Sequence, residues 1–217
     1  MSKSSGGGRP RAARTRVSDP ATAILLAAEA CYLRLGITKT TMDDIAREAG
    51  VSRPTVYRHY SNRDDLVLGV LLSRARDLLD RTRRFVDTRG RIDDKLIDGI
   101  LFLADAGGRD PMVQQLVSLE FMEGMQSHPE ASRLPVVLST EFWGPIVQAA
   151  QDAGEVRADL DVSAFCTWLT FVELVVLSRL HRPDSTDTDR RAFVGTYVVP
   201  ALHRAGTYGT VPVSAAG

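Results

Sequence analysis

Apolar residues recur at the three- and four-residue spacing of an amphipathic helix along nearly the whole chain. The first such run ends at Gly36, as expected of a glycine that follows a helix C-terminus, and it consists of Ile24, Ala27, Ala28, Cys31 and Leu35. Later runs are separated by glycine and proline. No segment shows the strict alternation of apolar and polar residues that a strand requires. The sequence therefore predicts an all-α fold without an internal repeat.

Length and composition place the chain among ordinary globular proteins. It has 217 residues, of which 44% are hydrophobic and 25% charged, which suits one or two domains with a substantial core. Cys31 and Cys166 lie far apart, and no Cys-x-x-Cys pair indicates a zinc or redox site. The N-terminus lacks the apolar segment of a secretory signal, and the most apolar stretch, 165–180, is too short to span a bilayer. We expect a cytoplasmic protein without a membrane partner.

The formal net charge of zero conceals an uneven distribution of charge. Residues 1–64 contain eleven Lys and Arg against six acids, whereas residues 65–217 contain 16 bases and 21 acids. Residues 1–18 carry five cations, three consecutive glycines and no acid, which predicts a flexible basic arm. A basic N-terminal part is typical of nucleic-acid binding, because contacts with phosphates supply most of the sequence-independent affinity.

Two short helices joined by a tight turn are predicted inside this basic part. Thr41 is a candidate N-cap for a helix over 42–49, which Gly50 ends, and Ser52 is a candidate N-cap for a second helix over 53–60. Pro54 falls in the first turn of the second helix, where its missing N–H is tolerated. No acid occurs between Val51 and Arg63. This spacing is typical of a helix-turn-helix whose second helix enters the major groove of DNA.

The residues that carry this pattern also resemble a known family. The run 41–52, TMDDIAREAGVS, continues into 53–66, RPTVYRHYSNRDDL, and resembles the signature of the TetR (tetracycline-repressor-like) family of bacterial transcription regulators. The resemblance covers roughly residues 20–66. Arg63 stands where the family usually has lysine, and Pro54 stands where a small residue is common. The resemblance implies an N-terminal three-helix helix-turn-helix domain followed by a C-terminal helical ligand-binding and dimerisation bundle.

The resemblance also implies which residues contact DNA. Arg53, Thr55 and Tyr57 would lie nearest the base edges, and the basic arm would reach a neighbouring minor groove. For Tyr60, packing beneath the next helix is an equally good interpretation. The candidate DNA-binding residues are Thr40, Thr41, Ser52, Arg53, Pro54, Thr55, Tyr57, Arg58, His59, Tyr60 and Arg63.

We expect four segments along the chain. Residues 1–18 form the arm, 19–64 the DNA-binding domain, 65–206 the effector-binding and dimerisation domain, and 207–217 a flexible tail. Within the third segment, the last three predicted helices cover 134–153, 161–180 and 189–205.

Aromatic residues and two acids indicate an effector site in the third segment. Eleven of the fourteen aromatic residues lie beyond residue 64. Two glutamates lie on apolar helix stripes, and a carboxylate that faces a core must be paired, protonated or in contact with a ligand. Ordinary core packing and a buried pair with arginine remain open as alternatives. The candidate ligand-binding residues are Glu120, Phe121, Met125, Phe142, Trp143, Trp168 and Glu173.

The last two helices have apolar residues on more than one face, which favours a homodimer through these helices. The four histidines are scattered, and neither a metal-ligand spacing nor a catalytic motif is present, so we expect no enzyme activity, metal or cofactor. We interpret the chain as a sequence-specific repressor that a small organic effector releases from a palindromic operator on double-stranded DNA. The alternative is a non-allosteric or architectural DNA-binding protein with a purely structural helical body.

Overall fold

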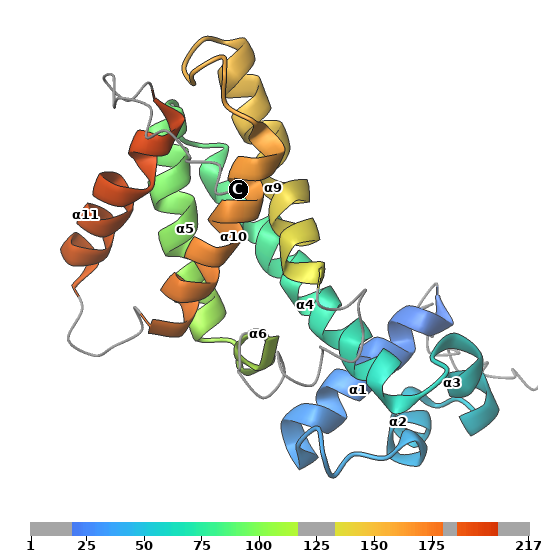
Figure 1. Cartoon of the computed structure of the whole chain (residues 1–217). Coiled ribbons are helices and arrows are strands. Elements are labelled where there is room, and N and C mark those ends of the chain that lie inside the picture. Colours follow the sequence, from blue (N-terminus) through green and yellow to red (C-terminus); the bar gives the residue numbers. More distant parts are fainter. Residues whose placement is uncertain (1–18, 117–132, 180–185, 204–217) are drawn as a thin grey trace, which may run out of the picture. The chain divides into compact units, whose positions relative to one another are not determined.

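The computed structural model describes residues 19–116, 133–179 and 186–203, and within these ranges it contains helices and turns but no strand (Figure 1). The predicted all-α fold is therefore confirmed. The chain divides into two compact units, Met1–Val70 and Leu71–Gly217. The four predicted segments remain predictions, and the arm and the tail lie outside the described residues.

The described part of the first unit, from residue 19 on, consists of three helices and the start of a fourth. They are α1 (Pro20–Leu35), α2 (Met42–Ala49), α3 (Arg53–His59) and α4 (Arg63–Val86), of which the part up to Val70 belongs to this unit. α1 contacts both α2 and α3, and α2 contacts α3. The centre of the unit is apolar, because Ile24, Ile45, Val56 and Leu66 are each at most 1% exposed.

Local capping defines the ends of the short helices. The Thr41 hydroxyl accepts from the Asp44 amide while the Asp44 carboxylate accepts from the Thr41 amide, so α2 begins with a complete capping box. Gly50 ends α2 with φ 66°, in the left-handed region that a residue with a Cβ rarely adopts. Ser52 then caps α3 by accepting from the Thr55 amide. These ends are the ones that the sequence predicts.

The second unit is a bundle of longer helices. Within the described residues its elements are the rest of α4, α5 (Ile92–Gly108), α6 (Pro111–Leu116), α9 (Leu134–Asp152), α10 (Val162–Arg179), α11 (Asp187–Tyr197) and a 3₁₀ turn at Val199–Leu202. α5 contacts α9, α10 and α11 (Figure 1). The expected final helix over 189–205 is wrong at its end, because α11 stops at Tyr197 and the 3₁₀ turn follows. Pro200 lies in that turn and has no amide hydrogen with which to continue an α-helix.

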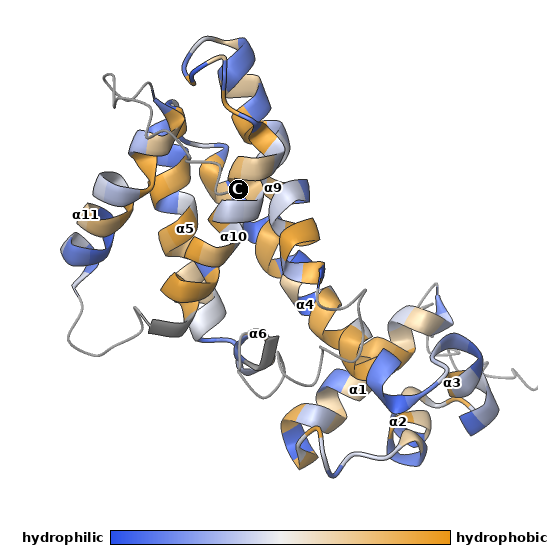
Figure 2. Cartoon of the chain, viewed as in Figure 1, coloured by the Kyte–Doolittle hydropathy of each residue, from blue (hydrophilic) through white to orange (hydrophobic). Residues whose placement is uncertain are grey.

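The core of the second unit lies where α5, α9 and α10 meet. Trp143 on α9, Leu96 on α5 and Leu169 on α10 have no exposed surface. Gly99 on α5 allows this close approach, because a Cβ there would lie 2.6 Å from the Trp143 ring. Figure 2 shows hydrophobic residues recurring along α5 and α10. The Trp143 ring of α9 thus packs directly against the backbone of α5 at Gly99, and this contact sets the distance between the two helices.

Both cysteines are free thiols inside the helical cores. Cys31 lies on α1 and Cys166 on α10, and neither has exposed surface. Burial raises the pKa of each thiol, to about 11 for Cys166. The thiols therefore serve as small apolar groups in the packing.

Candidate functional site

α2 and α3 are joined by a turn of a few residues whose geometry the backbone fixes. The Val51 amide donates to the Ala46 carbonyl at 3.0 Å, across the left-handed Gly50. Ala46 is only 5% exposed and Val56 is fully buried, so the two helices pack through small and branched apolar side chains. The arrangement is that of a helix-turn-helix, as predicted.

The outer face of α3 carries most of its polar residues. Ser52, Arg53, Pro54, Tyr57, Arg58 and His59 are exposed, whereas Val56 points into the core. Thr55 is partly exposed and its hydroxyl lies 2.9 Å from that of Ser52. A helix that presents cations, hydroxyls and an aromatic ring without an acid is suited to phosphates and base edges.

Arg53 is held in place by two neighbours. Its guanidinium donates to the Asp43 carboxylate on α2 at 3.1 Å and to the Tyr57 hydroxyl at 3.4 Å. These contacts raise the pKa of Arg53, with the Tyr57 hydrogen bond as the larger cause and the Asp43 charge next. Sequence reasoning did not identify Asp43. Its place in the first turn of the preceding helix was the available signal, since that turn faces the start of α3 in a helix-turn-helix.

Three of the predicted DNA-binding residues are engaged inside the first unit. Thr40 is 3% exposed, and its hydroxyl donates to the Gly36 carbonyl at 2.8 Å. The Arg63 guanidinium donates to the Ile37 carbonyl. The Tyr60 ring lies against Gly69 of α4, since a Cβ on Gly69 would be 3.0 Å from it, and burial raises the pKa of Tyr60. These positions support packing beneath the next helix as the role of Tyr60.

In the second unit, α9 and α10 bring together a cluster of polar groups. Trp143 Nε1 donates to Glu173 Oε1 at 2.6 Å, and the Ser139 hydroxyl donates to Glu173 Oε2 at 2.9 Å. Burial raises the pKa of Glu173 to about 7, although both hydrogen bonds act to lower it. The sequence left an arginine open as the partner of Glu173. Its partners in the structure are instead the Trp143 indole and the Ser139 hydroxyl. Ser139 was missed, although it precedes Trp143 by one helical turn.

The other candidate ligand-binding residues are divided among different places. Phe142 is buried, contacts Trp143 edge to face with centroids 4.8 Å apart, and lines a small cavity of about 280 Å³ between α4 and α9. Trp168 is 40% exposed on the outside of α10. Glu120, Phe121 and Met125 lie outside the described residues. The structure thus brings Phe142, Trp143 and Glu173 together and places Trp168 elsewhere.

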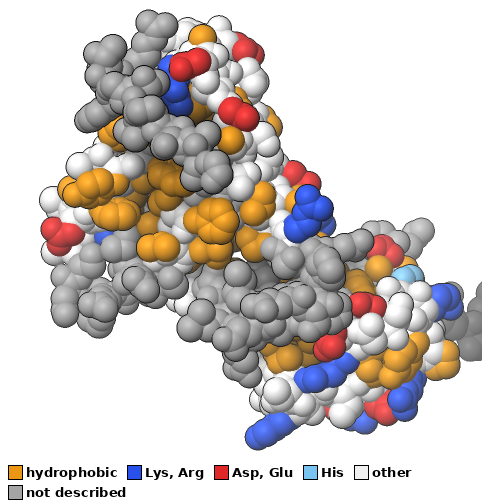
Figure 3. All heavy atoms as spheres, viewed as in Figure 1, with side chains coloured by type: hydrophobic (Ala, Val, Ile, Leu, Met, Phe, Trp, Pro, Cys, Tyr) orange, Lys and Arg blue, Asp and Glu red, His pale blue; other side chains and the backbone are white. Residues whose placement is uncertain are grey.

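α10 and α11 expose large apolar side chains. Trp168, Phe171 and Val175 recur along one side of α10 with exposed fractions of 40, 59 and 47%. Phe193 and Tyr197 on α11 are 37 and 67% exposed, and their ring centroids lie 5.3 Å apart. Figure 3 shows hydrophobic side chains gathered on the face of the second unit where Figure 1 places these two helices. We call these five residues the α10–α11 apolar face.

Comparison with known proteins agrees with the geometry of the first unit. Residues 24–70 match the family model described as bacterial regulatory proteins, tetR family. The chain belongs to the TetR family. It is accordingly a DNA-binding transcriptional regulator of the helix-turn-helix type. The family resemblance that the sequence motif indicated is confirmed.

Relatives of this TetR-family protein extend the likeness over most of the chain. An uncharacterised HTH-type transcriptional regulator of Mycobacterium tuberculosis, Rv2250c, is 28% identical over 171 residues, which cover 79% of this chain and 85% of the relative. The regulator UidR of Escherichia coli K12 is 24% identical over 174 residues, covering 79% of this chain and 86% of UidR. The relatives are transcription regulators, which agrees with the expectation that the protein is not an enzyme.

Solved structures share the fold of this TetR-family protein. The repressor AlkX from a Dietzia strain superposes with a TM-score of 0.61 at 20% identity, over 83% of this chain and 95% of AlkX. GusR of Salmonella enterica gives a TM-score of 0.60 at 20% identity, over 87% of this chain and 98% of GusR. At these identities the likeness concerns the helical architecture.

Neither a metal-binding cluster nor a membrane-spanning helix is found in the described part of this TetR-family protein. Across its described residues, no group of His, Cys, Asp and Glu could hold a metal ion. None of the helices described there has the length and apolar character needed to cross a membrane.

Proposed function

We propose that this TetR-family protein is a homodimeric repressor that binds a palindromic operator and is released from it by a small organic effector. In this proposal residues 19–64 form the DNA-binding part, and residues 65–206 bind the effector and hold the dimer together. The observation that carries the proposal is the outer face of α3, where exposed Arg53, Tyr57 and Arg58 stand on a helix fixed to α2 by the Gly50 turn.

The structure supports a division of roles among the candidate DNA-binding residues. In this proposal Arg53, Thr55 and Tyr57 read base edges, and the exposed Arg58 and His59 contact phosphates. Thr41 and Ser52 shape the helix N-termini, and Pro54 occupies the first turn of α3. Thr40, Tyr60 and Arg63 act by holding the unit in shape, because their polar groups or rings are engaged within it.

The α10–α11 apolar face supports the homodimer. The five large apolar side chains exposed on α10 and α11 make a surface that a monomer in water rarely retains. Pairing the same face of two copies buries them by twofold symmetry, and such a dimer presents two copies of α3 to DNA. Recognition helices related in this way read half-sites about one helical turn, roughly 34 Å, apart, which is why we propose a palindromic operator.

The polar cluster at Glu173 supports an effector site in the second unit. A carboxylate with a pKa raised to about 7 changes its charge readily when a ligand donor or cation approaches. The fold neighbours include a FadR of Bacillus subtilis, described in complex with stearoyl-CoA, with a TM-score of 0.52 and 16% identity. That neighbour supports an organic ligand as the class, and the AlkX neighbour is described as implicated in n-alkane biodegradation.

Footprinting of the purified protein on genomic DNA fragments tests the proposal. We expect protection of one palindrome with two half-sites, and loss of that protection in Arg53→Ala with much smaller loss of random-DNA binding. Uniform protection along the DNA would instead support the architectural alternative. The effector part is tested separately by titrating stearoyl-CoA into the operator complex, where release must depend on Glu173 and Trp143.

A further inference from the structure

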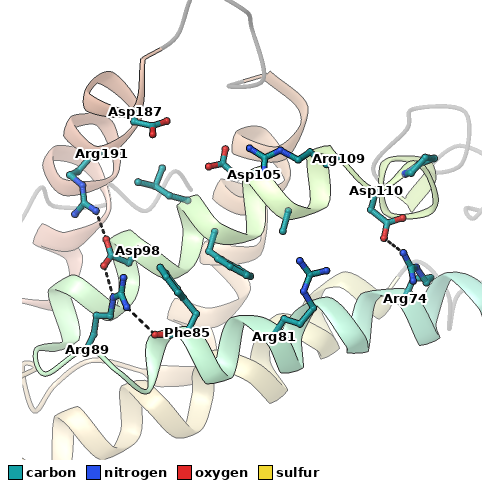
Figure 4. Close-up of a pocket in the computed structure, with 14 residues that line it drawn as sticks. Arg74, Arg81, Phe85, Arg89, Asp98, Asp105, Arg109, Asp110, Asp187 and Arg191 are labelled. Carbon is teal, nitrogen blue, oxygen red and sulfur yellow. Dashed lines mark hydrogen bonds and ion pairs between the residues drawn. The ribbon is translucent and has the colours of Figure 1, made fainter.

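A second candidate site lies within the second unit, and it shares no residue with the cluster of Glu173, Trp143 and Ser139. It is a pocket of about 690 Å³, a volume within the range of small-molecule sites. Its walls come from α4, α5, the start of α6 and α11, and Figure 4 shows their side chains arranged around it. The charged residues that line it are Arg74, Arg81, Arg89, Arg109, Arg191, Asp98, Asp105, Asp110 and Asp187.

Each of the four acids in this pocket already has an arginine partner. Asp98 accepts from Arg89 at 2.7 Å and also pairs with Arg191. Asp110 pairs with Arg74. Asp105 and Asp187 both pair with Arg190, which does not itself line the pocket. Four arginines thus balance the four carboxylates, although Asp105 and Asp187 share one of them.

Two arginines of the pocket have no ion pair among the residues that the structure describes. Arg81 extends from α4 and Arg109 from the C-terminal end of α5, on two sides of the pocket (Figure 4). Both side chains are exposed. With the acids paired, these two guanidinium groups leave the pocket with an excess of positive charge. A guanidinium of this kind binds a carboxylate or phosphate through two parallel hydrogen bonds.

Part of the pocket wall is aromatic. Phe85 of α4 and Phe102 of α5 stack with their ring centroids 4.7 Å apart. The Arg89 guanidinium lies 3.8 Å from the centroid of the Phe85 ring, whereas Arg81 is 5.9 Å from that of Phe102. The aromatic pair thus offers apolar surface in the same pocket as Arg81 and Arg109, the two cations without an ion pair to a described residue. This combination suits a ligand with a flat body and an acidic end.

We propose that this pocket binds an organic anion that has a flat aromatic body and a carboxylate. Arg81 and Arg109 hold the carboxylate, and the Phe85–Phe102 pair contacts the ring. The site is formed entirely within the second unit, so the proposal stands whether or not the protein is a repressor. It also differs from the residues that sequence reasoning assigned to the effector.

Isothermal titration calorimetry of the full-length protein with 2-naphthoate tests the proposal. We expect saturable binding at one site, at least tenfold weaker in the double variant Arg81→Gln/Arg109→Gln. Phe102→Leu keeps an apolar side chain but removes the ring, and it should weaken binding several-fold. Arg84→Gln is the matched control, because Arg84 is an exposed arginine on α4 outside this pocket, and it should bind as the wild type does.

Two other probes separate the chemical contributions. Neutral 2-naphthamide should bind at least tenfold more weakly than 2-naphthoate, and inorganic phosphate should give no comparable binding. The proposal is overturned by undetectable binding of 2-naphthoate, by equal binding of the amide, or by a double variant that binds as well as Arg84→Gln does. Thermal unfolding of each variant verifies that it is folded before its affinity is compared.

Discussion

Trp143 donates its indole hydrogen to Glu173 across the α9–α10 contact, with 2.6 Å between Nε1 and Oε1. The second carboxylate oxygen of Glu173 accepts from Ser139 at 2.9 Å. Both donors are neutral, so no cation compensates the carboxylate charge within this cluster. Burial therefore outweighs the hydrogen bonds, and the pKa of Glu173 is raised to about 7.

A raised pKa makes the stability of the fold depend on pH. Glu173 binds a proton more tightly in the folded chain than in the unfolded chain. Its contribution to the free energy of unfolding is therefore complete below about pH 4.5 and is lost as the pH rises through about 7. The wild type should lose up to about 3 kcal/mol of unfolding free energy relative to Glu173→Gln between pH 5 and pH 8. Urea unfolding of both proteins at the two pH values measures the difference. Parallel pH profiles would contradict the prediction.

Arg53 should determine operator specificity. Arg53→Ala is expected to weaken specific binding by about 1–3 kcal/mol if the guanidinium reads a base. Asp43→Asn should alter the specificity less severely, because it releases Arg53 from its partner at 3.1 Å without removing it. Fluorescence anisotropy with operator and random duplexes measures the two affinities for each variant. Arg34→Ala is the control, since Arg34 is an exposed arginine of α1 with its own partner, Glu48, and should leave the ratio of the two affinities unchanged.

Two glycines of the helical unit should respond to alanine in opposite directions. Gly99→Ala places a methyl group 2.6 Å from the Trp143 ring and should destabilise the fold by about 1–3 kcal/mol. Gly144→Ala is the matched control, because its nearest neighbour would be 4.0 Å away and alanine is favoured inside a helix by up to about 1 kcal/mol. Urea unfolding gives both values. A stable Gly99→Ala protein would show that α5 and α9 separate easily.

The α10–α11 apolar face should control self-association. Phe171→Glu adds a charge to a side chain that is 59% exposed and should shift a dimer to monomer, because pairing would then bury the charge. Sedimentation velocity measures the change. Leu33→Glu on α1 is an equally exposed apolar position, at 59%, and should leave the association state unaltered. Dimers that persist in Phe171→Glu would place the interface elsewhere.

Features fixed by neighbours in the chain were predictable from the sequence. The ends of α2 and α3 follow from Thr41, Gly50 and Ser52, whose effects act within one helical turn. The helix-turn-helix and the family follow from the same short segment. The end of α11 was predictable in principle from Pro200, but apolar periodicity past that residue indicated a longer helix.

Features that depend on distant residues were not predictable in this way. α10 has apolar residues on more than one face, so periodicity alone did not show that Phe165 and Leu169 face the core while Phe171 and Val175 face outward. The partners of Glu173 come from another helix, 30 and 34 residues away along the chain. Arg81 and Arg109 form no ion pair with a described residue, and this becomes informative only once the partner of each acid in the pocket is known.

The burial of Cys31 and Cys166 has a practical consequence. Thiolates rather than thiols react with maleimides and oxidants, and both thiols are shielded from solvent with raised pKa values. A cysteine introduced on the outer face of α3 or beside Arg81 would therefore react with such a label much faster than Cys31 and Cys166 do. The native sequence can carry a fluorophore or spin label at a chosen position without first replacing its own cysteines.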